Sequence, residues 1–203
     1  SMLTVAEGSL NTIMEILQNM KEKTVQAANA TMGTAERSAI KNELDALSAE
    51  IDDITGDTTF NGTSLFSATG TTSFTFQVNS ENGDTFGVTI STVGASAFSV
   101  ATANLDVTST ASSGSTLALI DTAITSLSNR LSTIGDNQKR LTFKLENLQT
   151  SMNNYEAARS RIADADFAKE QLEIVKLQIL QQTGTATLAQ SNAAPQSILQ
   201  LFQ

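Results

Sequence analysis

The most constraining feature of this chain is a set of apolar residues that step alternately by three and four positions. Such a step places one apolar side chain on the same face of an α-helix every 3.5 positions, which is typical of a coiled-coil seam. Three ladders of this kind lie within residues 3–20, 40–54 and 117–162. Their members are Leu3, Leu10, Ile13, Leu17 and Met20; Ile40, Leu44, Leu47, Ile51 and Ile54; and Leu117, Ile120, Ile124, Leu127, Leu131, Ile134, Leu141, Leu145, Leu148, Met152, Tyr155 and Ile162. Because a seam is buried only against another helix, the sequence predicts a mainly α fold, a long antiparallel helical bundle whose ladders are core.

Breaks in the ladders predict where the helices begin and end. The first helix is expected over residues 4–30, because Gly33 interrupts the pattern. Thr34 could cap a second helix, since its hydroxyl can accept a hydrogen bond from a free amide of the first turn. That helix would end near Gly56, and the long helix would begin near Thr116.

The segment between the ladders has a different pattern and predicts the smaller β part. Residues 57–113 are rich in Thr, Ser, Gly and Ala, and apolar residues alternate at period two in 74–78 and again in 86–90. The intervening Asn82-Gly83 is typical of a hairpin turn. Asn61-Gly62 predicts a second turn, residues 93–113 predict one or two short strands, and residues 111–115 read as a linker. The hairpin is expected to cap one end of the bundle.

Composition excludes most catalytic and nucleic-acid-binding classes. The chain has 203 residues, 12 Lys and Arg against 21 Asp and Glu, and a formal net charge of -9. Nucleic acid and an anionic membrane surface are therefore poor partners. With no His and no Cys, the chain lacks the side chains of the usual zinc sites, the Cys nucleophile and the Ser-His-Asp triad. No cofactor is expected, and the sequence predicts a protein that is not an enzyme.

Two groups of carboxylates could be interpreted as functional, Asp52, Asp53 and Asp57 in one and Asp164, Asp166 and Glu170 in the other. The second group lacks the glycine and the series of ligands of a calcium loop. Both groups fit a helical pattern better, so we expect them to cap and solvate helix ends and to bind no metal.

The C-terminal segment is unusually poor in charge. From residue 171 to residue 203 the only charged side chains are Glu173 and Lys176. A disordered terminus is the alternative, but disordered tails are rich in charge and poor in Leu and Ile. We therefore predict an interface made of Phe167, Leu172, Ile174, Val175, Leu177, Ile179, Leu180, Leu188, Ile198, Leu199, Leu201 and Phe202.

Motifs at both ends resemble bacterial flagellins. At the C-terminus these are the runs Ser160-Arg-Ile-Ala-Asp-Ala-Asp-Phe-Ala-Lys-Glu170 and 177–202, which includes Ser191-Asn-Ala-Ala-Pro195 and ends in Gln-Leu-Phe. At the N-terminus they are Ala6-Glu-Gly-Ser-Leu10, Val25-Gln-Ala-Ala-Asn29, Glu50-Ile-Asp52 and Phe60-Asn-Gly62. The resemblance covers residues 1–66 and 115–203.

The resemblance implies a flagellin core domain with a β-hairpin and a C-terminal terminal helix. By it, residues 1–56 are the N-terminal helices of the core, 57–113 the hairpin and variable segment, 114–166 the long core helix, and 167–203 the inner-tube helix. It implies a filament subunit exported by the flagellar type III system and found in the extracellular flagellum. The family's N-terminal terminal helix is expected to be missing, which would leave the chain deficient in polymerisation.

The partners implied are other flagellin subunits, the flagellin export chaperone, which would hold the C-terminal helix in the cytoplasm before export, and the hook-associated and cap proteins. Some flagellins also activate a Toll-like receptor, and the corresponding positions here are Asn19, Lys23 and Glu43. Strongly agonistic flagellins carry Arg and Leu at the first two of these positions, so we expect weak or no activation.

Two other classes compete with a filament subunit. A hook–filament junction protein shares the terminal architecture, but the Gln-Ser-Ile-Leu run after Pro195 favours a flagellin. A secreted hydrolase carrying a metalloprotease in its variable region would need a His-Glu-x-x-His helix, and the chain has no histidine.

Overall fold

The computed structural model describes residues 1–79 and 83–201, with the side chains of 164–166 and 193–201 left out of the description. The chain forms helices α1 (Met2–Ala27) and α2 (Thr34–Asp57), strands β1 (Thr59–Phe60), β2 (Thr63–Ser64), β3 (Thr72–Gln77) and β4 (Thr85–Ile90), a 3-10 helix (Thr102–Asn104), and helix α3 (Thr110–Leu201). The chain divides into two compact units, residues 1–146 and residues 147–203. The predicted class, mainly α with a smaller β part, is confirmed.

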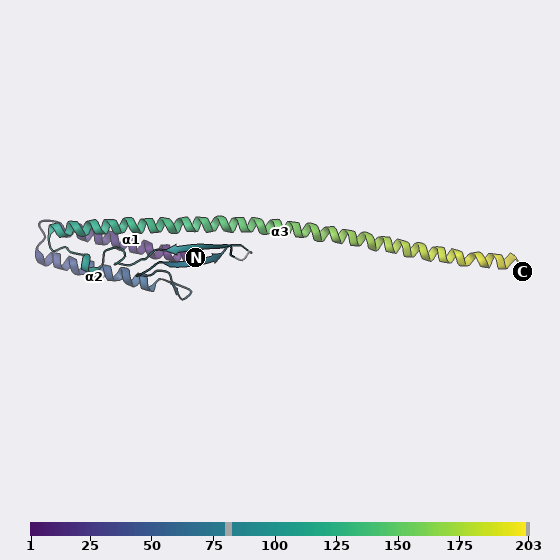
Figure 1. Ribbon diagram of the computed structural model, residues 1–203, viewed down its shortest axis with the longest axis horizontal. Helices are drawn as coiled ribbons and strands as arrows, with labels where there is room; N and C mark the ends of the chain where they lie inside the picture. Colours follow the sequence, from purple (N-terminus) through teal and green to yellow (C-terminus); the bar gives the residue numbers. More distant parts are fainter. Residues whose placement is uncertain (80–82, 202–203) are drawn as a thin grey trace. The chain divides into compact units, whose positions relative to one another are not determined.

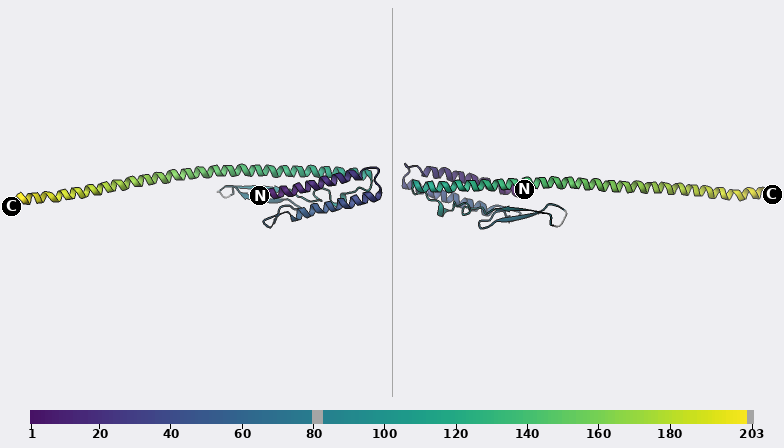
Figure 2. Two further views of the ribbon diagram at one scale, coloured as in Figure 1. Left: turned by 180° about the vertical axis from the view of Figure 1, so that it is seen from behind. Right: turned by 45° about the horizontal axis from the view of Figure 1, so that its top comes forward.

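In the first unit α1 and α3 lie antiparallel (Figures 1 and 2). Near one end of α1 the Nε2 of Gln138 donates a hydrogen bond of 2.9 Å to Oε2 of Glu7. Near the other end Lys21 Nζ lies 2.7 Å from Asp121 Oδ1. Residue numbers that rise along one helix therefore fall along the other.

Helix α2 is also antiparallel to α1 and consequently parallel to the first part of α3. Lys23 Nζ lies 2.7 Å from Glu43 Oε1, and the Thr58 hydroxyl lies 3.0 Å from the Ser9 hydroxyl. These contacts place α1 between the other two helices as their common partner.

The ladders form the core of the first unit over part of their predicted length. The five residues of the first ladder are buried, and α2 contributes Ile40, Leu44 and Ile51. On α3 the side chain of Ile134 is buried, whereas that of Leu145 is 63% exposed. The prediction of core packing along 117–162 is therefore wrong for Leu145, Met152, Tyr155 and Ile162, which are 63–77% exposed. Met2 of α1 lines a groove with Gln138 and Leu141 of α3, so the packing between these helices reaches this level of α3.

The predicted hairpin is confirmed as β3 and β4, which pair antiparallel with Phe76 opposite Phe86. Gly83 has φ +97°, whereas Asn82 lies outside the described residues. Phe86, Val88 and Ile90 are buried because every second side chain of β4 faces the core. The Arg140 guanidinium lies 4.7 Å from the ring centroid of Phe86. The hairpin therefore lies along α3, and the expectation that it caps an end of the bundle is wrong.

The second predicted turn is also confirmed. β1 and β2 pair around Asn61 and Gly62, which have φ of 51° and 77°. Two successive positive φ angles are typical of a tight turn whose twist matches that of the strands.

Residues 93–107 contain no strand, and the expectation of one or two short strands there is wrong. Instead Val93, Phe98, Val100, Leu105 and Val107 are buried in an irregular segment with one 3-10 turn. The spacing of these apolar residues does not define the backbone that carries them.

Residues 111–115 are the first turns of α3, so the predicted linker is wrong. Ser109 precedes the helix and accepts a hydrogen bond from Ser112 N at 3.1 Å, while Ser109 N donates to the Ser112 hydroxyl at 3.0 Å. This reciprocal pair has the geometry of a capping box, with Ser in place of the usual Glu. At the start of α2 the capping position is Gly33, with no side-chain hydrogen bond, so the prediction that Thr34 caps this helix is also wrong.

Candidate interaction surfaces

The second unit is the part of α3 from residue 147 onward, and its apolar side chains are exposed. Phe167 is 68%, Leu172 72%, Leu177 58% and Leu188 65% exposed. Four more residues of the predicted interface, Ile174, Val175, Ile179 and Leu180, are 46–58% exposed. Ile198, Leu199, Leu201 and Phe202 lie outside the residues whose side chains are described. This predicted interface is thus available for contact along 167–188.

These apolar residues are distributed around the whole helix. With roughly 100° per residue, Leu172, Ile174, Leu177 and Leu180 point in directions separated by more than half a turn. A helix that is apolar all round is normally buried on every side. A single partner helix would cover only one stripe of it.

The three positions related to receptor recognition lie on α1 and α2. Lys23 and Glu43 form the ion pair described above, with 32% and 44% of their side chains exposed. Asn19 is exposed and precedes Lys23 by one turn on the same face of α1. The fold brings all three positions to one surface, and two of them neutralise each other there.

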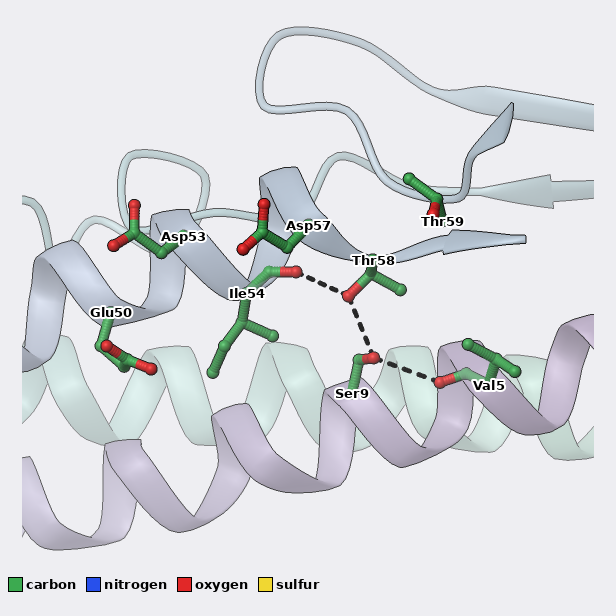
Figure 3. Close-up of a pocket in the computed structure, with 8 residues that line it drawn as sticks. All are labelled: Val5, Ser9, Glu50, Asp53, Ile54, Asp57, Thr58 and Thr59. Atoms are coloured by element: carbon green, nitrogen blue, oxygen red, sulfur yellow. Dashed lines mark hydrogen bonds between the residues drawn. The ribbon is translucent and has the colours of Figure 1, made fainter. Parts of the chain in front are cut away.

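A groove of about 350 Å³ lies between α1 and the end of α2 (Figure 3). Its carboxylates, Glu50, Asp53 and Asp57, recur at helical spacing along one face of α2 and are exposed. Its apolar carbon comes from Val5, which is 41% exposed, and from Ile54. We call this the acidic groove; the remaining lining residues are Ser9, Thr58 and Thr59.

Hydrogen bonds hold the two walls of the acidic groove together. The Thr58 hydroxyl donates to the Ile54 carbonyl at 2.6 Å, and the Ser9 hydroxyl donates to the Val5 carbonyl at 3.2 Å. The two hydroxyls lie 3.0 Å from each other (Figure 3). Among the described residues no three metal-ligand side chains are close enough to hold a metal ion.

Asp52 is exposed near the end of α2, as expected of a solvated helix end, but it also makes a long-range contact that was not predicted. Its Oδ1 accepts a hydrogen bond of 2.8 Å from Ala95 N, and it lies 3.1 Å from the position that a Cβ at Gly94 would occupy. Asp52 therefore holds the irregular segment 93–98 against α2. Nothing in the local spacing of the sequence indicates this contact, because the two residues are 43 positions apart.

Arg37 is another structural residue that sequence reasoning missed. Its Nη2 donates hydrogen bonds of 3.0 Å to the Asn29 carbonyl and to the Thr110 hydroxyl. The side chain thereby connects the α1–α2 turn to the start of α3. No motif marks it, because its partners come from two segments that are far apart in the sequence.

Comparison with known proteins agrees with this arrangement. The bacterial flagellin N-terminal helical region matches residues 1–71, and the bacterial flagellin C-terminal helical region matches residues 117–202. A flagellin of Halalkalibacterium halodurans is 36% identical over 203 residues, covering 100% of this chain and 74% of the relative. The flagellar filament 33 kDa core protein of Treponema phagedenis is 32% identical over 216 residues, an alignment that covers 100% of this chain and 76% of the relative.

The crystal structure of Bacillus cereus flagellin superposes with a TM-score of 0.62 at 28% identity, covering 78% of this chain and 90% of that one. The chain therefore belongs to the bacterial flagellin family, whose members are structural proteins of the flagellar filament. Because the N-terminal family region matches from residue 1, the expectation that this region is missing is not supported. Within the described residues no helix is long and apolar enough to cross a membrane.

Proposed function

We propose that this chain polymerises with copies of itself into the flagellar filament, and that the helix from residue 167 onward is buried between subunits there. The observation that carries the proposal is the exposure of apolar side chains on all sides of this helix. A coiled-coil seam needs one partner, whereas an all-round apolar surface needs several neighbours. Packing many copies around a common axis supplies these neighbours. The contacts between copies are heterologous, so they generate an open helical filament and not a closed ring.

The same surface is proposed to bind the flagellin export chaperone in the cytoplasm before type III export to the extracellular filament. An apolar helix that is poor in charge is prone to aggregate if it stays uncovered, so a cell that makes the protein before exporting it needs a partner that covers this helix. The hook-associated and cap proteins are proposed as contacts at the two ends of the finished filament. The absence of His-based chemistry and the structural family support a role that is not enzymatic.

Polymerisation is tested with Leu177→Gln combined with Leu180→Gln in the full chain. These changes remove two exposed apolar side chains that lie about 60° apart on the helix. We expect loss of sedimenting filaments in electron microscopy and ultracentrifugation, while circular dichroism of the chain stays unchanged. The matched control, Gln181→Ala with Gln182→Ala, keeps the apolar side chains and should polymerise normally. Normal filaments from the leucine variant would refute the proposal.

Chaperone binding is a separate measurement on the same proteins. The wild-type chain is co-expressed with the cognate chaperone, and size-exclusion chromatography with light scattering measures the mass of the complex. A defined heterodimer is expected for the wild type and the control, and free chains for the leucine variant. Equal complex formation by all three would show that the chaperone uses another surface.

We further propose weak activation of the flagellin-sensing Toll-like receptor. At the position where strong agonists carry Leu, Lys23 is held by Glu43 at 2.7 Å. A partner would have to desolvate both charges or break the pair, and neither gives the contact energy of an apolar anchor. A reporter-cell assay with wild type and Lys23→Leu tests this, with a higher response expected from the variant. A strong response to the wild type would contradict it.

A further inference from the structure

A cationic and aromatic surface lies on α3 within the first unit. Lys139, Arg140, Phe143 and Lys144 fall within roughly 140° of the helix circumference, and we call these four residues the basic surface. Phe143 is 67% exposed, and Lys144 Nζ lies 5.8 Å from the ring centroid of Phe86. Residues 137–145 contain three cations and no carboxylate, between Asp136 and Glu146. In a chain with a net charge of -9, this local excess of positive charge is unusual.

The acidic groove has the complementary chemistry. Its three carboxylates can receive cationic heads, and the carbon of Val5 and Ile54 can contact the stem of a lysine or an aromatic ring. None of the eight residues that line it is a cation. The groove thus matches the basic surface in both charge and apolar content.

The two surfaces lie on different sides of the first unit. Ser9 lines the acidic groove, whereas Glu7 contacts Gln138 of α3. Two residues correspond to roughly 200° around a helix, so Glu7 and Ser9 flank the buried stripe of α1 on opposite sides. A groove on the α2 side of α1 therefore cannot receive the basic surface of its own α3.

We propose that the acidic groove of one copy receives the basic surface of a second copy, forming a lateral contact between first units. The proposal rests on the proposed polymerisation and names a contact that the second unit does not provide. In a pair of copies, one contributes its acidic groove and the other its basic surface. Each copy therefore keeps one of its two surfaces open for a further copy. Such a contact is heterologous and extends from copy to copy. The charges also oppose a contact of one acidic groove with another, or of one basic surface with another, because like charges repel.

Charge reversal in the full chain tests the contact. Asp53→Lys with Asp57→Lys makes the groove positive, and Lys139→Glu with Lys144→Glu makes the basic surface negative. Each variant alone should need a roughly tenfold higher protein concentration for association, the size expected from two or three exposed ion pairs. The matched control for the groove variant is Glu15→Lys with Glu22→Lys. It makes the same change in net charge as Asp53→Lys with Asp57→Lys, but at exposed positions of α1, and should associate like the wild type.

Rescue distinguishes a charge contact from damage to the fold. An equimolar mixture of the two variants offers a positive groove to a negative surface and a negative groove to a positive surface, so it should associate again. The chain carrying all four substitutions should associate with itself. If either variant fails to fold, the wild type provides a second measurement, because its association should weaken between low and high salt. Failure of the mixture and of the fourfold variant to associate would overturn the proposal, as would a salt-independent wild type.

Two readouts separate this inference from the proposed function. Sedimentation velocity below the concentration for filament growth measures pairwise association, and electron microscopy above it measures polymer. Filaments that form equally well from wild type and both charge variants would overturn the lateral contact alone. Pairwise association that follows the charge pattern, without any filament, would overturn polymerisation alone.

Discussion

The two units of this chain use apolar side chains in opposite ways. In the first unit Leu10, Ile13 and Leu17 of α1 are fully buried against helices of the same chain. In the second unit Leu172, Leu177 and Leu188 are more than half exposed, although they belong to the same helix that supplies part of the first core. Apolar residues at helical spacing are thus buried in the first unit, where helices of the chain pack on one another, and exposed in the second.

The largest difference between the units is expected from leucine truncation. Leu17→Ala removes a fully buried side chain and should cost about 2–5 kcal/mol of unfolding free energy, from lost transfer energy and the cavity left behind. Leu172→Ala makes the same chemical change at a side chain that is 72% exposed and should stay within about 0.5 kcal/mol. Urea denaturation followed by circular dichroism measures both. Similar losses from the two variants would show that the second unit has a core of its own.

A second pair of substitutions tests the irregular segment that α2 holds in the first unit. Gly94 has φ +148°, and an added Cβ would lie 3.1 Å from Asp52 Oδ1, so Gly94→Ala should destabilise by about 1–3 kcal/mol through backbone strain. Gly56→Ala is the control, because Gly56 lies within α2 and nothing is within 4 Å of its added Cβ. That change should stabilise by about 0.5–1 kcal/mol. Thermal unfolding of both variants gives the comparison, and a neutral Gly94→Ala would mean that the segment adapts.

A smaller effect is expected at the start of α3. Ser109→Ala removes the hydroxyl that accepts a hydrogen bond from Ser112 N at 3.1 Å, and loss of such a cap should cost about 1 kcal/mol. Ser115→Ala is the matched control, since its exposed hydroxyl bonds only within the helix, to the Ala111 carbonyl. Chemical denaturation distinguishes the two. An equal effect at both serines would show that the cap contributes little.

The sequence predicts elements with a repeated local pattern better than it predicts contacts between distant segments. Helical and alternating periodicity predicted α1, α2, the hairpin and the core of the first unit, because each is a repeated local pattern. Periodicity could not predict that Leu145 of α3 is exposed whereas Ile134 is buried, because burial depends on which elements lie alongside each turn of the helix. It also missed Arg37 and Asp52, whose long-range hydrogen bonds leave no repeating signal in the sequence. Of the candidate surfaces, the proposed apolar interface follows from composition alone, whereas the acidic groove required the pairing of α1 with α2.

The smallest effect is a dependence of stability on pH that should be specific to the first unit. Hydrogen bonds from Thr108, first from its backbone N–H, lower the pKa of Asp106 below its ordinary value of 3.8. A lowered pKa in the folded chain stabilises it above the pKa of the unfolded chain, and this contribution is lost as pH falls through the folded value. Asp106→Asn should therefore lower the stability near neutral pH, where this contribution is present, and approach the wild type in acid, so that the acid limb of stability below about pH 4 is flatter. Urea denaturation at a series of pH values measures this, with Asp136→Asn as the control. Parallel acid limbs in wild type and Asp106→Asn would show that other carboxylates carry the dependence.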